Sequence, residues 1–110
     1  MSIQIALEDL VELAPEYGPS AYAVVGTDAG PPRITHSPVT FTPHGELVVD
    51  IGRSSHRALA ERPALALLWP ATNEQSMSLI VDCEVVGSLD LDDGGEVRLR
   101  PTGAVRHRPA

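Results

Sequence analysis

The stretch that decides the fold is RITHSPVTF at 33–41, followed by the turn residues TPHG at 42–45 and by LVVDI at 47–51. The first segment has the β-branched and aromatic character of a strand. Pro38 lies inside it and demands an edge position or a bulge, because proline cannot donate to the hydrogen-bond ladder. In 47–51 the residues alternate between an apolar face and a second face that carries Asp50. The stretch therefore predicts a β-hairpin whose first strand is interrupted or lies at an edge.

The segments on either side of this hairpin extend the β pattern. Four more segments read as strands, the last of them broken by Pro101: 20–27, 64–69, 76–89 and 96–108. Two helices are expected, one over 5–16 and a connecting helix over 56–62 with Ser54 or Ser55 as its N-cap. Strands in hairpin order with short polar turns favour a small antiparallel barrel over a sandwich or a doubly wound sheet. The expected fold is mainly β with minor α, in one domain over 1–110.

The charged residues exclude several classes of chemistry. The 110 residues carry a formal net charge of −7, and all eight basic residues are arginine. A chain without lysine has no Schiff-base lysine and no Walker-type phosphate lysine. An acidic balance also argues against nucleic acid or an anionic membrane as the main partner. Any bound anion must be held by arginine, backbone amides or hydroxyls.

The single cysteine and the N-terminus bear on the compartment. Cys83 cannot form a disulfide within the chain, which fits a reducing compartment. Residues 1–14 lack the basic start and apolar centre of a signal peptide, and no apolar run approaches the length of a membrane helix. We expect a cytoplasmic domain. The alternation around Cys83 predicts a buried, inert thiol rather than a nucleophile.

The strongest local signal for a binding site is IGRSSHR at 51–57. A strand ends, a glycine permits a tight turn, and two hydroxyls and two arginines precede a helix. Helix amides and guanidinium groups together suit a phosphate, and no lysine is needed. The alternative interpretation is an ordinary serine-capped helix with exposed arginines.

Other chemistry-bearing side chains give weaker signals. The four histidines show no metal-ligand spacing, so no metal site is expected. Trp69 and Tyr22 are expected in the core rather than as a stacking surface. Three aspartates in the predicted turn at 90–95 are expected to form a solvated loop. No catalytic residue can be assigned from these side chains.

Taken in chain order, these features resemble the pyridoxamine 5′-phosphate oxidase-like FMN-binding split barrels. Arg33 and the following HSPVTF are similar to the family pattern R-P-x-x-S-P-V-x-F. GELVV at 45–49, the serine and arginine turn, and ERPALALLW at 61–69 follow in the family's order, the last like x-N-P-x-V-x-L-L. The resemblance covers about residues 5 to 108.

The resemblance implies a six-stranded antiparallel split barrel of Greek-key type that forms a homodimer, with FMN at the subunit interface. It implies a flavin-dependent oxidoreductase acting on an unknown small molecule, in which His36, expected near the flavin, is the best candidate for acid or base chemistry. Carried over by position, phosphate binding falls on Arg53, Ser54, Ser55 and Arg57. Contacts to the flavin ring fall on His36, Ser37, Pro38, Val39, Asp50, Ile51 and Gly52, with Ser78 reaching the flavin from a later strand.

The chain departs from the family pattern at two positions. The family often has a lysine where Ser55 stands and an asparagine where Ala58 stands. Oxidation of pyridoxamine phosphate itself is not expected, because its phosphate would need a second basic cluster. The alternatives are a non-catalytic flavin or nucleotide carrier or sensor, a deazaflavin- or haem-binding relative, and a barrel without cofactor whose dimer is only structural.

Overall fold

The fold is taken from a computed structural model that describes residues 2–72, 75–87, 89 and 95–108. Within these residues the chain forms seven strands, two α-helices and two short 3₁₀ segments. Their bounds are β1 Ser2–Gln4, η1 Leu7–Asp9, α1 Leu10–Leu13, η2 Ala14–Tyr17, β2 Ser20–Val25, β3 Arg33–Phe41, β4 Leu47–Asp50, α2 Arg53–Glu61, β5 Ala64–Trp69, β6 Ser78–Val85 and β7 Glu96–His107.

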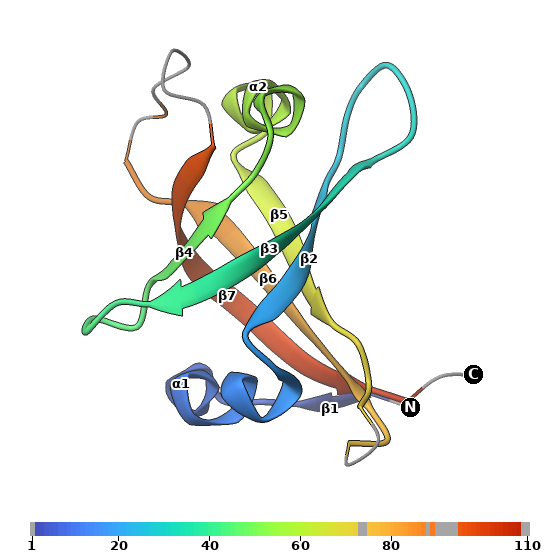
Figure 1. Cartoon of the computed structure of the whole chain (residues 1–110), viewed down its shortest axis with the longest axis vertical. Helices are drawn as coiled ribbons and strands as arrows, with labels where there is room; N and C mark the ends of the chain where they lie inside the picture. The colour runs from blue at the N-terminus through green and yellow to red at the C-terminus, as the bar shows by residue number, and fades with distance from the viewer. Residues whose placement is uncertain (1, 73–74, 88, 90–94, 109–110) are drawn as a thin grey trace.

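Six of the strands close into a barrel. The neighbours run in the order β7, β4, β3, β2, β5, β6, and β6 pairs with β7 to complete the ring. Every pairing is antiparallel. The predicted six-stranded antiparallel barrel is confirmed (Figure 1). The short β1 was not predicted, and it extends the sheet beside β7 through pairs such as Ile3 with Arg106.

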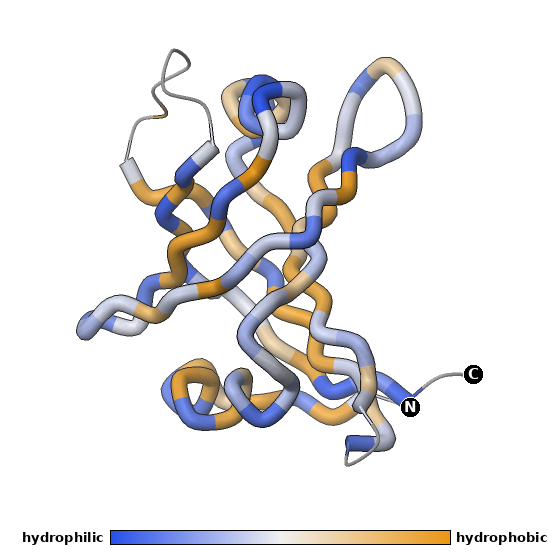
Figure 2. The backbone as a smooth tube through the Cα atoms, viewed as in Figure 1, coloured by the Kyte–Doolittle hydropathy of each residue, from blue (hydrophilic) through white to orange (hydrophobic). Residues whose placement is uncertain are grey.

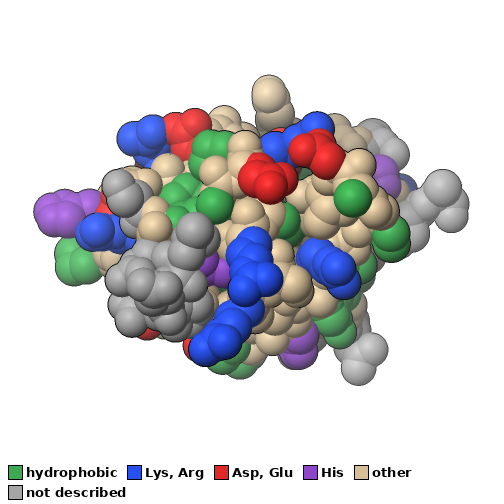
Figure 3. All heavy atoms as spheres, turned by 90° about the horizontal axis from the view of Figure 1, so that it is seen from above, with side chains coloured by type: hydrophobic (Ala, Val, Ile, Leu, Met, Phe, Trp, Pro, Cys, Tyr) green, Lys and Arg blue, Asp and Glu red, His purple; other side chains and the backbone are tan. Residues whose placement is uncertain are grey.

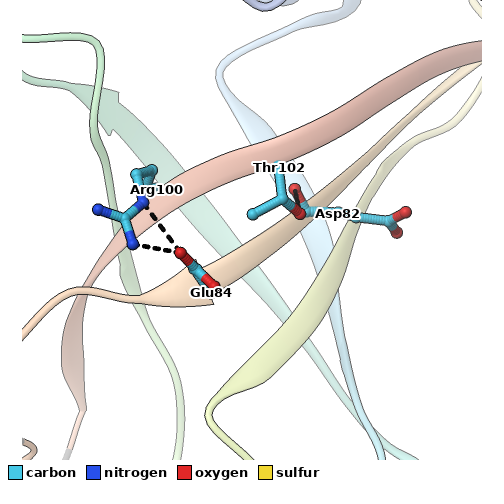
Figure 4. A network of polar contacts seen from close by, with 4 residues as sticks. All are labelled: Asp82, Glu84, Arg100 and Thr102. Atoms are coloured by element: carbon cyan, nitrogen blue, oxygen red, sulfur yellow. Dashed lines mark hydrogen bonds and ion pairs between the residues drawn. The ribbon is translucent and has the colours of Figure 1, made fainter.

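Strand β7 does not break at Pro101, contrary to the sequence expectation. The register passes from Asp82 opposite Gly103 to Cys83 opposite Pro101, so Thr102 is an extra residue on β7. This is a β-bulge, which lets a strand bend without ending. The Thr102 hydroxyl donates to the Asp82 carbonyl oxygen at 3.2 Å, and Arg100 pairs with Glu84 one step along (Figure 4). Proline is tolerated because it lies at the irregularity.

Pro38 is accommodated by a side chain. β3 is an interior strand, and Pro38 pairs with Ser20 of β2. On the other side the pairs with β4 run only from Phe41 to Val39, so Pro38 lies just past their end. There the backbone N–H of Asp50 donates to Ser37 Oγ at 2.8 Å, and that hydroxyl donates to the Pro38 carbonyl at 2.8 Å. The expected interruption is therefore the end of the β3–β4 ladder, and beyond it the Ser37 hydroxyl links the two strands.

The barrel interior is the hydrophobic core, and the helical segments lie at its two ends (Figure 1). Buried residues alternate with more exposed ones along β2, β4 and β5, and Trp69 and Cys83 are among the fully buried ones. Figure 2 shows hydrophobic residues (orange) along the barrel strands. The predicted N-terminal helix forms as η1, α1 and η2, and it buries Leu10, Ala14 and Tyr17 at helical spacing. No helix within the described residues has the length and apolar character that crossing a bilayer requires.

Helix α2 begins three residues earlier than its sequence predicts. Its N-cap is Gly52, and no side chain caps it, so the expectation of a serine cap was wrong. The reason is burial: Ser55 lies inside the first turn, where its hydroxyl meets that of Thr35 on β3 at 3.5 Å. His56 and Leu59 are buried with it, so the helix is anchored to the barrel by packing.

Replacing Ser37 with alanine is expected to destabilise the protein by about 1–3 kcal/mol, because it leaves the Asp50 N–H at the barrel wall without its acceptor. Urea denaturation measures the effect. The exposed Ser76, replaced in the same way, should change the free energy of unfolding by less than about 0.5 kcal/mol. Equal stability of the two variants would show that the Ser37 bridge is dispensable.

Candidate functional site

Except for Ser78, the predicted binding residues lie where β3, the end of β4 and the start of α2 meet. The Asp50–Ser37 hydrogen bond joins β4 to β3, and the Thr35–Ser55 contact joins β3 to α2. Beyond β4, the N–H of Ile51 donates to the Gly95 carbonyl at 2.7 Å. Gly95 has a φ of +119°, which favours glycine, and a Cβ there would lie 2.8 Å from Asp50 Oδ1. These contacts fix the backbone on which the site is built.

The structure separates the predicted site residues by exposure. Seven are exposed: His36, Pro38, Asp50, Gly52, Arg53, Ser54 and Arg57. Val39 is partly buried, as is Ser78, which lies on β6 with β2 and β5 between it and β3. Ser37, Ile51 and Ser55 are at most 3% exposed. The side chains of these three are occupied in packing and internal hydrogen bonds, which leaves only their backbone groups for a ligand.

The N-terminus of α2 is an uncapped, positively charged helix end. With no side-chain cap, the first-turn amides have no partner within the helix. Arg53 and Arg57 are exposed and one helical turn apart. Among the described residues no carboxylate lies within ion-pair distance of either, whereas Arg62, Arg98 and Arg100 each have one. Figure 3 shows basic side chains (blue) on this end of the molecule. The geometry suits an anion.

Tyr22 lies outside the barrel, contrary to the expectation that it belongs to the core. Its ring stacks on His36 with centroids 4.5 Å apart and an interplanar angle of 18°. The sequence did contain the signal, because Ala21, Ala23 and Val25 take the inward positions of β2 and leave Tyr22 on the other face. The side chain is 37% exposed. An aromatic pair therefore lies on the outer surface, on the strand that contacts the first turn of α2.

The stacked pair begins a row that crosses the outer face of the barrel. The registers align His36 with Tyr22, Tyr22 with Leu68, Leu68 with Ile80, and Ile80 with Val105. Beyond the stacked pair the row is apolar, and its last three side chains are only partly buried. The neighbouring Ile34 is 65% exposed. An extended apolar face of this kind is typical of a surface that binds a partner or ligand.

The remaining candidate groups lie apart from this surface. Cys83 is 2% exposed, as predicted, and burial together with the charge of Asp82 raises its pKa to about 12. His56 was not predicted as a core residue, yet it is 2% exposed and its Nδ1 has no hydrogen-bond partner. Within the described ranges no three His, Cys, Asp or Glu side chains form a metal-binding group. The predicted turn aspartates at 90, 92 and 93 lie outside those ranges.

The fold and the placement of its helices define a split barrel. No family model matches the chain, and no curated protein matches it. Among solved structures it is similar to the crystal structure of HutZ, the haem storage protein from Vibrio cholerae. The TM-score is 0.58 at 13% sequence identity, over 93% of this chain and 96% of that chain. At that identity the likeness establishes a shared fold.

Cys83 is expected to resist thiol reagents in the folded protein at about pH 8, because the reactive form is the thiolate and burial keeps the thiol protonated. The unfolded thiol ionises near its ordinary value of 9.0, so this group makes folding less favourable as the pH rises above 9.0 toward about 12. Labelling with a chromogenic disulfide, with and without concentrated urea, tests this. Rapid labelling without urea would contradict it.

Proposed function

We propose that this chain is a non-catalytic split-barrel protein that binds a planar aromatic cofactor with an anionic tail, FMN or haem, between two copies of itself. The observation that carries the proposal is the uncapped N-terminus of α2, with Arg53 and Arg57 free of carboxylate partners among the described residues. It lies beside the part of β3 that carries the exposed His36.

The anionic tail fits this helix end without a lysine. Phosphate in FMN and propionate in haem are both accepted by backbone N–H groups and by guanidinium forks. Arginine suits this role better than lysine where planar recognition by two N–H groups is needed. Ser54, exposed in the first turn, adds a hydroxyl, while Ser55 is turned toward Thr35. The tail site would thus consist of two arginines, one serine and the first-turn amides.

The ring system is proposed to lie on the outer face near His36. For FMN, the ring contacts of the split-barrel resemblance fall on His36, Pro38 and Val39, which are exposed or partly buried on β3. For haem, an exposed imidazole is a suitable axial ligand to iron. The structural similarity to a haem storage protein favours haem as the second candidate. The two cofactors share the chemistry that the site offers.

Binding, rather than catalysis, is the property that this geometry supports. A bound flavin carries its own redox chemistry, and the protein supplies binding and orientation. The buried Cys83 is not available as a nucleophile. An oxidoreductase activity would require a reductant, and bleaching of a bound flavin by NADH or NADPH would add that activity to the proposal.

The dimer is proposed from the apolar row on the outer face. Tyr22 and Ile34 are large side chains with 37% and 65% of their surface exposed. A second copy that presents the same row would cover both, because a two-fold interface is self-complementary. The row ends at His36, so such an interface would run up to the proposed ring site.

The wild-type protein is expected to bind FMN or haem, and Arg57→Ala is expected to weaken that binding about 10-fold to 100-fold, the loss of a charge-assisted hydrogen bond. Arg98→Ala is the matched control and should change Kd by less than about twofold, since Arg98 makes only an exposed ion pair. Flavin fluorescence and the haem Soret band report the two cofactors separately.

Two results would count against this function, and a third would decide between its two cofactors. Binding of neither cofactor would refute it altogether. Equal losses in the Arg57 and Arg98 variants would remove the tail site from α2. Binding of haem alone, lost in His36→Ala, would assign the site to haem and exclude FMN.

Ile34→Glu is expected to convert the dimer into a monomer, because it places a charge on the apolar face that the second copy covers. Val11→Glu is the control: Val11 is 48% exposed on α1, at the far end of the barrel. Sedimentation velocity distinguishes the two states. A wild-type monomer at micromolar concentration, or a dimer that survives Ile34→Glu, would contradict the proposed interface.

A further inference from the structure

We infer that Tyr22 is a positioning residue of the cofactor site. Its ring holds the imidazole of His36 roughly perpendicular to the sheet, so that the outer edge of the imidazole meets the cofactor ring. The inference rests on the proposed function and adds a residue to it. The sequence placed Tyr22 in the core, and the split-barrel resemblance assigned it no role. The structure places it against the one imidazole that the proposed ring site contains.

The contact between the two rings is specific. Tyr22 and His36 are directly opposite each other in the β2–β3 register, and their rings are nearly parallel at 4.5 Å between centroids. Side chains on a strand stand roughly perpendicular to the sheet. Two rings that stand in this way and face each other direct their far edges outward. The hydroxyl of Tyr22 and the ring atoms of His36 far from Cβ are therefore at the surface.

Tyr22 can act as a support because it is held more firmly than His36. Its strand lies between β3 and β5, and its neighbours Ala21 and Ala23 are completely buried. Leu68 of β5 flanks it on the side away from His36. Within the described residues no residue of β4 is paired opposite His36, since the β3–β4 pairs end at Val39. Without Tyr22 the imidazole would be free to change rotamer.

The supported imidazole lies close to the anion-binding end. Continuing the register of Val39 with Val49 would set Gly52, the N-cap of α2, opposite His36. The next residue inward on β3, Thr35, contacts Ser55 in the first turn of that helix. One cofactor can thus meet the imidazole edge with its ring and the helix amides with its tail. A misplaced imidazole would weaken ring contact and leave the tail contact unchanged.

The test compares Tyr22→Leu, which removes the ring, with Tyr22→Phe, which keeps it. The Kd for whichever of FMN and haem binds is expected to rise about fivefold in Tyr22→Leu, the value of one aromatic pair, and to stay within about twofold in Tyr22→Phe. Val24→Ala is the matched control, because Val24 occupies the next outward position of β2 opposite Ile34.

A second measurement needs no cofactor. In the NMR spectrum of the free wild-type protein, the ring protons of His36 are expected upfield of their ordinary positions because the Tyr22 ring covers them. The shift should persist in Tyr22→Phe and vanish in Tyr22→Leu. Ordinary shifts in the wild type would overturn the inference, even if the leucine variant did not fold.

The outcomes separate the inference from the function beneath it. Equal binding by the wild type and Tyr22→Leu overturns the role of Tyr22 and leaves the proposed function standing. A fivefold loss in Tyr22→Phe as well would assign the effect to the hydroxyl and overturn the positioning role. A wild type that binds neither cofactor overturns both. A loss in Tyr22→Leu alone, together with the upfield His36 protons, supports the inference.

Discussion

The pairing of β7 with β4 along one part of its length and with β6 along another turns a curved sheet into a closed barrel. Closing a sheet into a ring requires curvature, and the extra residue Thr102 lets β7 bend beside Pro101. At this bulge, where the regular hydrogen-bond ladder is interrupted, the Thr102 hydroxyl donates a hydrogen bond to the Asp82 carbonyl oxygen. Closure gives each strand of the six-stranded ring a partner on both sides, although β3 before Val39 has no β4 partner and β1 ends the sheet beside β7.

The candidate site follows from that closure. The barrel interior is filled by apolar side chains, and the candidate site lies on the outer surface. The polypeptide leaves the sheet at Asp50 and re-enters at Ala64, and α2 occupies this interval at one end of the barrel. Its uncapped start is held there by Ser55 and His56, which are buried. The packing that anchors the helix is therefore what presents its first-turn amides.

The sequence predicted best where one residue pattern determines one structure. Segments 33–41 and 64–69 formed strands with the predicted bounds, because alternation and bordering prolines or turns left few alternatives. The start of α2 was predicted wrongly because the sequence alone does not distinguish a serine that caps a helix from one that is buried in its first turn. Only the fold shows that Ser55 lies against Thr35. Tyr22 was misplaced because aromatic residues are most often buried, and only the inward alanines beside it reveal the face. β1 has three exposed residues and depends wholly on pairing with β7.

Because the chain has no lysine, only arginine side chains can supply permanent positive charge to a bound anion. In a chain of net charge −7, the overall field repels an anionic cofactor, so any attraction must arise within a few ångströms. Arg62, Arg98 and Arg100 are committed to carboxylates, and Arg106 bonds to Gln75. Arg53 and Arg57 lie at the positive end of a helix dipole, where guanidinium groups without a carboxylate partner among the described residues are close to the unpaired first-turn amides. A protein of this composition can recognise an anion at that helix end, although its net charge opposes the approach.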